Sequence, residues 1–589
     1  MKQEKTRMSA GRIKRLMDAA LGKEPADLAV VNAKLLNVFT GELLSDHGIC
    51  VKDGKTVFVG REAGDLADKS THIIDADGMT AIPGFIDGHT HIAGEHLPEE
   101  FLKYAMTGGT TAVITEIFEV YFAAGLSGVL EYLEAVRGQP IKIYAAAPAM
   151  VSISELAAGI DPEDLETILA QPEIICMGES YWQSVLQQPE RYLPAFETIR
   201  KYGLPLEGHS AGAGEQKLAA YLNAGISSCH EPITVQETLS RLRQGLCVMI
   251  REGSVRRDLE AVAEIRRENV DLRRLALVSD GITPEALVEK GYMEALVQKA
   301  IDLGFAPAEA VRMASLNVAE HFGMGGNIGS IAPGRDADFI LIPDINHIKA
   351  ECVIAEGKII AQNGKALVAP KPHTFSDSSK NTIPLPRPMQ PADFEIHARS
   401  NRSKQSIRAI EMVSNLVTRE KIIETPVHKG LIHAEPENEL ARVAAINRRQ
   451  EPGKCFTGLI KGFGIKCGAL ASSGAWDVSG IIVVGADESD MAAAINAICE
   501  TGGGIVAVKN GRVVAQLPQP VFGTISELPM ERIMECGSEI KSAAESFGIK
   551  FPDPVLSLNT LTTPAIPFLR ICEQGLVDLK TGATLDLFA

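Results

Sequence analysis

The sequence predicts an α/β protein: a (β/α)₈ TIM-like barrel, a small β-sandwich domain built from both flanks of the barrel, and a C-terminal α+β domain. Three observations predict this architecture. Between residues 80 and 335, short apolar segments alternate with helical patterns. β-like runs with turn residues between them precede and follow this region. A mixture of strand and helix patterns then returns after a linker rich in proline and serine.

The central region contains eight apolar segments that we expect to be parallel strands, with helical segments such as residues 162–170 and 214–225 between them. Most of these segments end in His, Glu or Asp. In (β/α)₈ barrels the carboxyl ends of the strands carry the active site, so this repetition predicts an enzyme. The eight segments are residues 85–91, 111–115, 141–147, 174–179, 204–209, 226–231, 247–252 and 275–280.

The outer segments predict the domain boundaries. β-like runs occupy residues 27–74, and a similar pattern returns at 336–342 and 352–367, so both sides of the barrel are expected to supply one small sheet domain. The predicted parts are residues 1–79 (N-terminal segment and part of the small β domain), 80–335 (barrel), 336–368 (remainder of the small domain), 369–391 (linker) and 392–589 (C-terminal domain).

Composition narrows the class of partner. Of 589 residues, 45% are hydrophobic and 23% charged, as in soluble globular proteins. The formal net charge of −17 argues against nucleic acid or an anionic membrane as the main partner, and the expected small-molecule substrate is inferred from the site residues below. Ten scattered cysteines without CxxC spacing, an N-terminus without a signal-peptide core, and no apolar stretch of about 18 residues predict a cytoplasmic protein.

A candidate metal site begins with His89 and His91 at the end of the first barrel segment. Alternate residues of a strand point to the same face, so the two imidazoles project together. Each later candidate, taken alone, is more often structural, but together they supply imidazoles and a carboxylate able to bridge two ions. Such a set suits one or two divalent ions of the Zn²⁺, Mn²⁺ or Fe²⁺ type. The further candidates are Glu179, His209, His230 and Asp280, and Asp280 also fits a catalytic proton shuttle.

These residues resemble the amidohydrolase superfamily, and within it the bacterial adenine deaminases. The resemblance covers about residues 25–580 and is carried by PGFIDGHTH and by segments 208–231, 242–254, 458–473 and 481–508. It implies a binuclear centre of Mn²⁺ or Fe²⁺, with Zn²⁺ as the alternative, and a dimer or larger homo-oligomer. It also implies the metal ligands His89, His91, His209, His230 and Asp280, with Glu179 in the place where many relatives have a carboxylated lysine.

Around the ligands the sequence departs from the family pattern in four segments. Where the family has I-E-S-S after the two histidines, this chain has Ala93–Glu95 and its neighbours. Where the family has D-P-H-E, it has Glu116–Glu119, with Phe118 in place of the histidine. T-D-D-R-H-P becomes 279–284, where Gly281–Thr283 lose an Asp and a His, and H-D-S-H-N becomes Trp476–Gly480. Retained ligands with altered surroundings predict retained hydrolytic chemistry and leave the substrate open. Arg251, Glu252 and Glu119 are the candidate substrate contacts, and a structural salt bridge and helix cap is the alternative for segment 251–254.

Three functions are open at this point. The first, which would place the protein in purine metabolism, is hydrolytic deamination of adenine to hypoxanthine and ammonia. Metal-activated hydroxide would attack C6, and Asp280 would carry the proton to the departing amine. The second keeps this mechanism and acts on another aminopurine, or on a cyclic amide or ureide. The third, a non-catalytic binding module, is disfavoured because all six candidate ligands are present.

Overall fold

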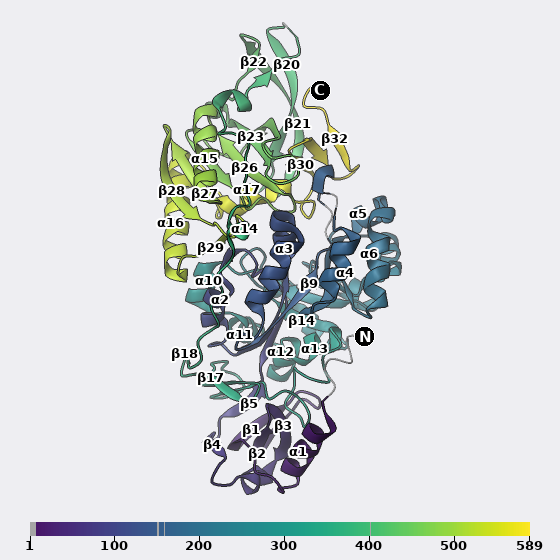
Figure 1. Cartoon of the computed structure of the whole chain (residues 1–589). Coiled ribbons are helices and arrows are strands. Elements are labelled where there is room, and N and C mark those ends of the chain that lie inside the picture. The colour runs from purple at the N-terminus through teal and green to yellow at the C-terminus, as the bar shows by residue number, and fades with distance from the viewer. Residues whose placement is uncertain (1–7, 150–151, 158, 401) are drawn as a thin grey trace.

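The computed structural model describes residues 8–149, 152–157, 159–400 and 402–589, so the first seven residues of the predicted N-terminal segment lie outside it. The protein is of the mixed α/β class, as predicted. Figure 1 shows three parts along one long axis: a small β-rich part with the N-terminal strands, a central part of strands and helices, and a C-terminal part. None of the helices in the described ranges is long and apolar enough to cross a bilayer.

The central part is built on eight parallel strands. Five form one sheet in the order β11-β10-β9-β8-β6, and three form another in the order β12-β13-β14. The sheets adjoin at both edges, because Ser227 N donates to Leu206 O (2.8 Å) and Asp280 N donates to His89 O (3.0 Å). Each strand lies within one of the eight predicted segments or overlaps it. The strands are β6 (Phe85–Thr90), β8 (Thr110–Glu116), β9 (Lys142–Ala147), β10 (Ile174–Tyr181), β11 (Leu206–His209), β12 (Ser228–Cys229), β13 (Cys247–Arg251) and β14 (Leu275–Val278).

Helices connect these strands and cover their outer side. Several begin at side-chain caps, such as Asp161, Thr234 and Thr283, which accept hydrogen bonds from the first-turn amides. Because each connection returns the chain to the same edge, the carboxyl ends of all eight strands lie together. The helices are α2 (Pro98–Ala105), α3 (Phe118–Val136), α4 (Pro162–Leu169), α5 (Trp182–Gln187), α6 (Pro189–Lys201), α7 (Glu215–Asn223), α8 (Val235–Arg243), α9 (Leu259–Val262), α10 (Pro284–Lys290), α11 (Met293–Asp302), α12 (Pro307–Met313) and α13 (Leu316–His321).

The small β-rich part draws its strands from both flanks of the central part. Its nine strands form one sheet, in which β5 pairs with β1 on one side and with β15 on the other. β5 continues through Gly84 directly into β6, so this sheet anchors the strand that carries His89. The elements are α1 (Ala10–Ala20), β1 (Leu28–Asn37), β2 (Glu42–Lys52), β3 (Lys55–Gly60), β4 (His72–Asp75), β5 (Thr80–Pro83), β15 (Phe339–Ile342), β16 (Cys352–Ala355), β17 (Lys358–Gln362) and β18 (Lys365–Ala366).

The C-terminal part is a ten-stranded sheet in the order β19-β22-β21-β20-β24-β23-β26-β25-β27-β28, with helices and a three-stranded sheet, β30-β31-β32, around it. The elements are α14 (Asp377–Lys380), β19 (Ile396–His397), β20 (Lys404–Met412), β21 (Thr418–His428), β22 (Leu431–Ile432), β23 (Leu440–Asn447), β24 (Cys455–Lys461), β25 (Ala469–Ser472), β26 (Gly480–Gly485), α15 (Glu488–Glu500), β27 (Gly504–Lys509), β28 (Arg512–Pro518), β29 (Ile525–Ser526), α16 (Met530–Phe547), α17 (Pro554–Asn559), β30 (Leu569–Cys572), β31 (Gly575–Asp578) and β32 (Ala583–Leu585).

Among the contacts that join the C-terminal part to the central part, two involve the segments after β6 and β8. The short strand β7 (Glu95–His96) pairs in parallel with β29, and Glu95 N donates to Thr524 O (2.8 Å). Helix α3 is kinked at Gly125, whose φ is 65°. A kink leaves carbonyls of the preceding turn free, and here Arg449 Nη1 donates to Tyr121 O (2.7 Å) and Ser479 Oγ donates to Phe122 O (2.6 Å).

Candidate metal centre

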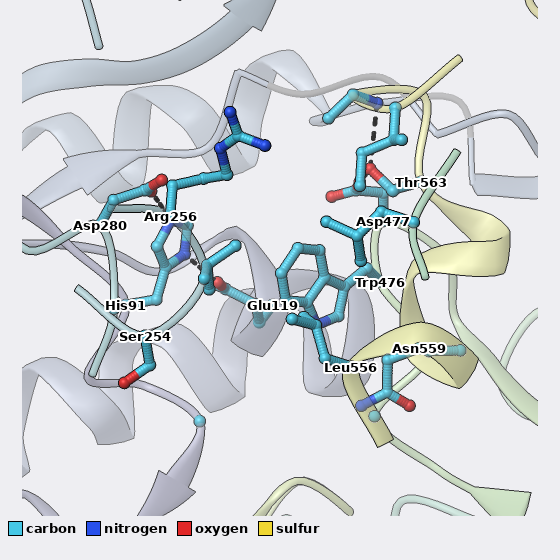
Figure 2. A pocket seen from close by; sticks show the side chains of 18 of the residues that line it. His91, Glu119, Ser254, Arg256, Asp280, Trp476, Asp477, Leu556, Asn559 and Thr563 are labelled. Carbon is cyan, nitrogen blue, oxygen red and sulfur yellow. Dashed lines mark hydrogen bonds and ion pairs between the residues drawn. The ribbon is translucent and has the colours of Figure 1, made fainter. Parts of the chain in front are cut away.

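A cavity of about 460 Å³ lies between the carboxyl ends of the central strands and the C-terminal part. Its central-part wall includes His91, Glu179 and Asp280, and its C-terminal wall includes Trp476 and Asp477. Figure 2 shows His91 and Asp280 across the cavity from Asp477 and Thr563, with Trp476 beside Glu119. The cavity is therefore lined by both parts of the chain.

The six predicted metal ligands come together at this end of the strands. Each lies at or next to the carboxyl end of a strand. His89 and His91 lie at the end of the same strand, β6, and the other four lie at four different strands. All are buried apart from the half-buried His91. They are His89 in β6, His91 after it, Glu179 in β10, His209 at the end of β11, His230 after β12 and Asp280 after β14.

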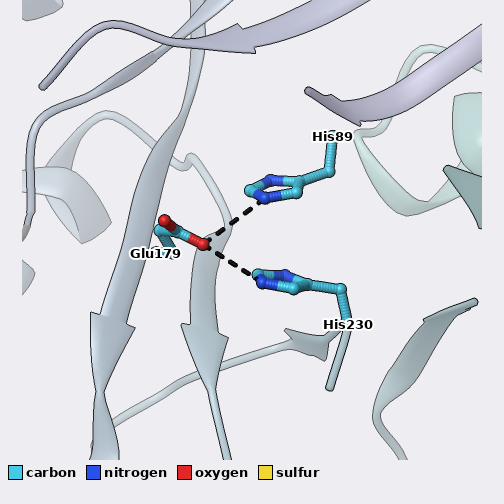
Figure 3. A group of neighbouring side chains, drawn as sticks. All are labelled: His89, Glu179 and His230. Carbon is cyan, nitrogen blue, oxygen red and sulfur yellow. Dashed lines mark ion pairs between the residues drawn. The ribbon is translucent and has the colours of Figure 1, made fainter. Parts of the chain in front are cut away.

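The Glu179 carboxylate is the centre of the first group. Its Oε2 lies 2.5 Å from Nε2 of His209, 3.1 Å from Nε2 of His230 and 3.4 Å from Nε2 of His89. Figure 3 shows the His89 and His230 rings pointing at this one oxygen. The three Nε2 atoms and Oε2 are buried and make no hydrogen bond within the described residues. Imidazole nitrogens gathered on a carboxylate oxygen are the donors that a borderline divalent cation prefers.

Asp280 is the centre of a second, adjoining group. Its Oδ1 lies 3.2 Å from Nε2 of His89 and 3.5 Å from Nε2 of His91. His89, Glu179 and His230 offer ligand atoms within 4.8 Å of one another, and so do His89, His91 and Asp280. The two groups share His89, so the donor set fits two neighbouring cations as well as one.

Outer carboxylates orient the imidazoles. Oε1 of Glu119 lies 2.5 Å from Nδ1 of His91, and Oε1 of Glu231 lies 2.9 Å from Nδ1 of His209. A proton held on Nδ1 by such a carboxylate leaves the Nε2 lone pair free for a cation. The sequence singled out Glu119 as a substrate contact and missed Glu231, although Glu231 directly follows the predicted ligand His230.

Electrostatics keep the two central carboxylates ionised. Burial alone would raise the pKa of Glu179, but His209, His230 and His89 hold it well below its usual range. Burial would likewise raise the pKa of Asp280, but His89, His91 and Arg251 hold it well below normal. Burial, together with His89 and His209, lowers the pKa of His230 to about 4, so its imidazole is neutral. Burial would lower the pKa values of His89, His91 and His209, but the neighbouring carboxylates raise them, so these imidazoles hold protons that a cation would displace.

The predicted substrate contacts fall in different places. Arg251 lines the cavity, with Nη1 3.3 Å from Oδ2 of Asp280 and Nη2 2.9 Å from Oδ2 of Asp258. Glu119 lines the cavity as well. The Glu252 carboxylate instead pairs with Lys299 Nζ (2.7 Å) and is not among the residues that line the cavity. Successive residues of an extended chain point to opposite sides, which separates Arg251 from Glu252.

The segments that depart from the family pattern lie at the cavity. Phe118, Ile282 and Trp476 give it apolar surface. Asp477 also lines it, is held by the Thr563 hydroxyl, and accepts a longer hydrogen bond from Tyr181 Oη (3.4 Å). Burial raises the pKa of Asp477 to about 7. The sequence marked residues 476–479 as unusual without giving Asp477 a role, because both of its partners, Thr563 and Tyr181, lie far from it in the sequence.

Comparisons with known proteins found related families, sequences and structures. A model of the amidohydrolase family matches residues 80–367, and a model of the adenine deaminase C-terminal domain matches residues 415–583. The adenine deaminase of Moorella thermoacetica is 34% identical over 581 residues, covering 97% of each chain. Adenine deaminase 3 of Rhizobium meliloti is 33% identical over 577 residues, covering 96% of each. The crystal structure of a β-aspartyl dipeptidase from Fervidobacterium islandicum aligns with a TM-score of 0.47 at 18% identity, over 59% of this chain and all of that one.

The strand-end site and the amidohydrolase match define the class of the protein: it is an amidohydrolase-type enzyme with a candidate metal centre. The near-complete coverage at 34% identity narrows the class further. The chain belongs to the adenine deaminase family.

Proposed function

We propose that the protein is a metal-dependent hydrolase that converts adenine and water to hypoxanthine and ammonia. The observation that carries this proposal is the pair of adjoining ligand groups that share His89, at the wall of a cavity that the family's C-terminal domain closes. The substrate, adenine, is inferred from membership of the adenine deaminase family. The two sheets are proposed to form one closed (β/α)₈ barrel, with the domain limits given under Sequence analysis.

The cofactor that we propose is a binuclear divalent centre of Mn²⁺ or Fe²⁺. His89, His91, Glu179, His209, His230 and Asp280 would hold it. Bound divalent cations lower the pKa of a coordinated water toward neutrality and so supply a nucleophile for the amidine carbon C6. Glu119 and Glu231 fix the ring orientation of His91 and His209, which sets the direction of the Nε2 lone pairs.

Asp280 is the proposed proton carrier. Its Oδ1 faces His89 and His91, while Oδ2 lies 3.3 Å from Arg251 Nη1. Arg251 favours the ionised carboxylate, which can take a proton from the attacking water. The same group would return the proton to the exocyclic nitrogen as the C–N bond breaks. The apolar side chains Phe118, Ile282 and Trp476 would exclude bulk water around the purine ring.

The cytoplasm is the proposed location, and a homo-oligomer, dimer or larger, the proposed assembly. Both rest on the composition and on the family resemblance.

A second substrate class is favoured by one observation. Phe118, Ile282 and Trp476 stand in the altered segments and all line the cavity. Another aminopurine, or a cyclic amide or ureide, would then react by the same chemistry, because the ligand groups are unchanged.

The test is ammonia release from adenine by protein purified without chelator and loaded with Mn²⁺ or Fe²⁺. We expect rapid release that a chelator abolishes, and a loss of about 10²–10⁴-fold in kcat for Asp280→Asn. Metal content is measured for both proteins, so that lost metal is told apart from lost proton transfer. If the fully metallated protein releases no ammonia from adenine but hydrolyses other purines or cyclic amides, the second substrate class replaces adenine.

A further inference from the structure

The cavity extends beyond the metal-ligand groups into the C-terminal part. There its wall consists of segments at one end of the ten-stranded sheet: Arg448 follows β23, Ser473 follows β25 and Gln519 follows β28. These three strands run in the same direction in the antiparallel order, so their carboxyl ends lie at the same edge. This far end of the cavity has no role in the chemistry proposed above.

Arg448 is a buried cation without a counter-charge. Its side chain is 2% exposed, and its Nε and Nη1 atoms have no hydrogen-bond partner. Among the described residues, no carboxylate forms an ion pair with it, and the neighbouring charge is that of Arg449. Burial, aided by Arg449, lowers the pKa of Arg448 to about 10, so it stays protonated at neutral pH. A buried charge without compensation is destabilising, and proteins rarely keep one without use.

The other buried arginines of the described chain have partners. Two bind carboxylates, and two, which like Arg448 form no ion pair, bind carbonyl oxygens; among the described residues the Arg448 side chain has neither kind of partner. The pairs are Arg251 with Asp258, Arg442 with Glu488, Arg241 with Ser210 O and Arg570 with Ile566 O.

Polar groups around Arg448 extend this donor surface. Thr524 lines the cavity, and its Oγ1 is buried without a hydrogen-bond partner. Gln519 lines the cavity and is 3% exposed. Gly523 lies against Arg448 Nη1, and a Cβ at this position would collide with it. The hydroxyl of Thr524 and the amide of Gln519 thus line the same cavity as a planar guanidinium, the group that binds phosphate or carboxylate oxygens.

We propose that Arg448 forms an anion-binding subsite, at which its guanidinium binds a phosphate or carboxylate group of a ligand held in the same cavity. The cavity volume of about 460 Å³ lies in the range that accommodates drug-sized ligands, so a free purine base fills only part of it. The anion is either a substituent of the substrate or a separate small anion. The first source rests on the proposed function, and the second does not.

The binding test compares wild type with Arg448→Met, Arg448→Gln and Arg448→Lys, all loaded with the same metal. Thermal unfolding is followed with phosphate against chloride at equal ionic strength, and with adenosine 5′-monophosphate against adenosine. All four proteins keep the metal ligands, so anion binding to the cations cancels in the comparison. We expect an anion-dependent rise in the Tm of wild type that Met and Gln abolish and Lys partly retains.

The anion-free proteins give an independent readout. Removing an uncompensated buried charge is expected to leave the Tm of Arg448→Met unchanged or to raise it by about 1–3 °C. A structural role for Arg448 predicts the opposite: a lower Tm in the neutral variants, and equal responses of all four proteins to both anionic probes. That combined result would overturn the subsite. If Arg448→Met fails to fold, Arg448→Gln carries the same comparison.

Ammonia release then identifies the source of the anion. A kcat/KM for adenosine 5′-monophosphate at least tenfold above that for adenosine, lost in Arg448→Met, assigns the subsite to a substrate substituent. A phosphate-dependent change in the KM for adenine, lost in the same variant, assigns it to a separate anion. An Arg448-dependent Tm shift without deamination of any of these compounds supports the subsite and refutes the proposed function. Deamination of adenine without an Arg448-dependent Tm shift supports the proposed function and refutes the subsite.

Discussion

At the scale of single residues, two carboxylates matter that are not candidate metal ligands themselves. They contact the imidazoles of the candidate ligands. Glu231 Oε1 lies 2.9 Å from Nδ1 of His209, and Glu119 contacts Nδ1 of His91, so each carboxylate favours a proton on that nitrogen. Without these carboxylates the rings could rotate, or carry the proton on the nitrogen that should bind the cation. The ligand residues alone therefore do not define the metal affinity.

Glu231→Gln should weaken metal binding by about 10–100-fold, because an amide holds the Nδ1 proton of His209 less strongly than a carboxylate does. Metal retained after dialysis against a graded chelator series measures the effect. Glu173→Gln is the matched control, since Glu173 precedes β10, far from its carboxyl end, and pairs with Arg137. Equal retention by wild type and Glu231→Gln would contradict the role given to Glu231.

At the scale of elements, the kink of α3 explains how the C-terminal part is held. Gly125 sits in the left-handed region, which L side chains rarely adopt, and its open side faces the Arg449 guanidinium. The carbonyls of the kinked turn accept hydrogen bonds from Arg449 and Ser479. The kink at Gly125 thus lets backbone carbonyls of α3 accept hydrogen bonds from the C-terminal part.

Gly125→Ala should destabilise the protein by about 1–3 kcal/mol, because alanine is strained at this φ and its methyl group meets Arg449. Chemical denaturation with a probe in each part of the chain measures this loss. Ser127→Ala, an exposed position of the same helix, serves as the control and should change stability little. Unchanged stability of Gly125→Ala would show that α3 accommodates a regular turn there.

Much of the element pattern could be predicted from the sequence, because the central strands are short, apolar and bounded by polar or glycine-containing turns. That the six candidate ligands lie together could be predicted as well, since His89, Glu179 and Asp280 each end a strand segment. The positions of Glu252 and Arg448 could not. Glu252 faces Lys299 and not the cavity because of a local alternation of side chains, and the isolation of Arg448 depends on segments far apart in the sequence.

At the scale of the whole molecule, the proposed metal ligands come from strands spread across the central part. Cations bound to His89, Glu179 and Asp280 would cross-link β6, β10 and the end of β14, and so stabilise the folded state by mass action. Chelation should therefore lower the temperature of the unfolding transition of the central part by several degrees, and added Mn²⁺ or Fe²⁺ should restore it. Calorimetry of the same sample before and after dialysis measures the change. An unfolding profile insensitive to chelator would argue against cations at these residues.

The pairing of β7 with β29 has a consequence for synthesis on the ribosome. Glu95 and its neighbours emerge early, while Thr524 and Ile525 are made long after Asp280 has left the exit tunnel. Until then the central part lacks the C-terminal wall of the cavity, which includes Trp476 and Asp477. A chain that stops after the central part is therefore expected to leave His91, Glu179 and Asp280 open to solvent, and to lack a complete substrate cavity.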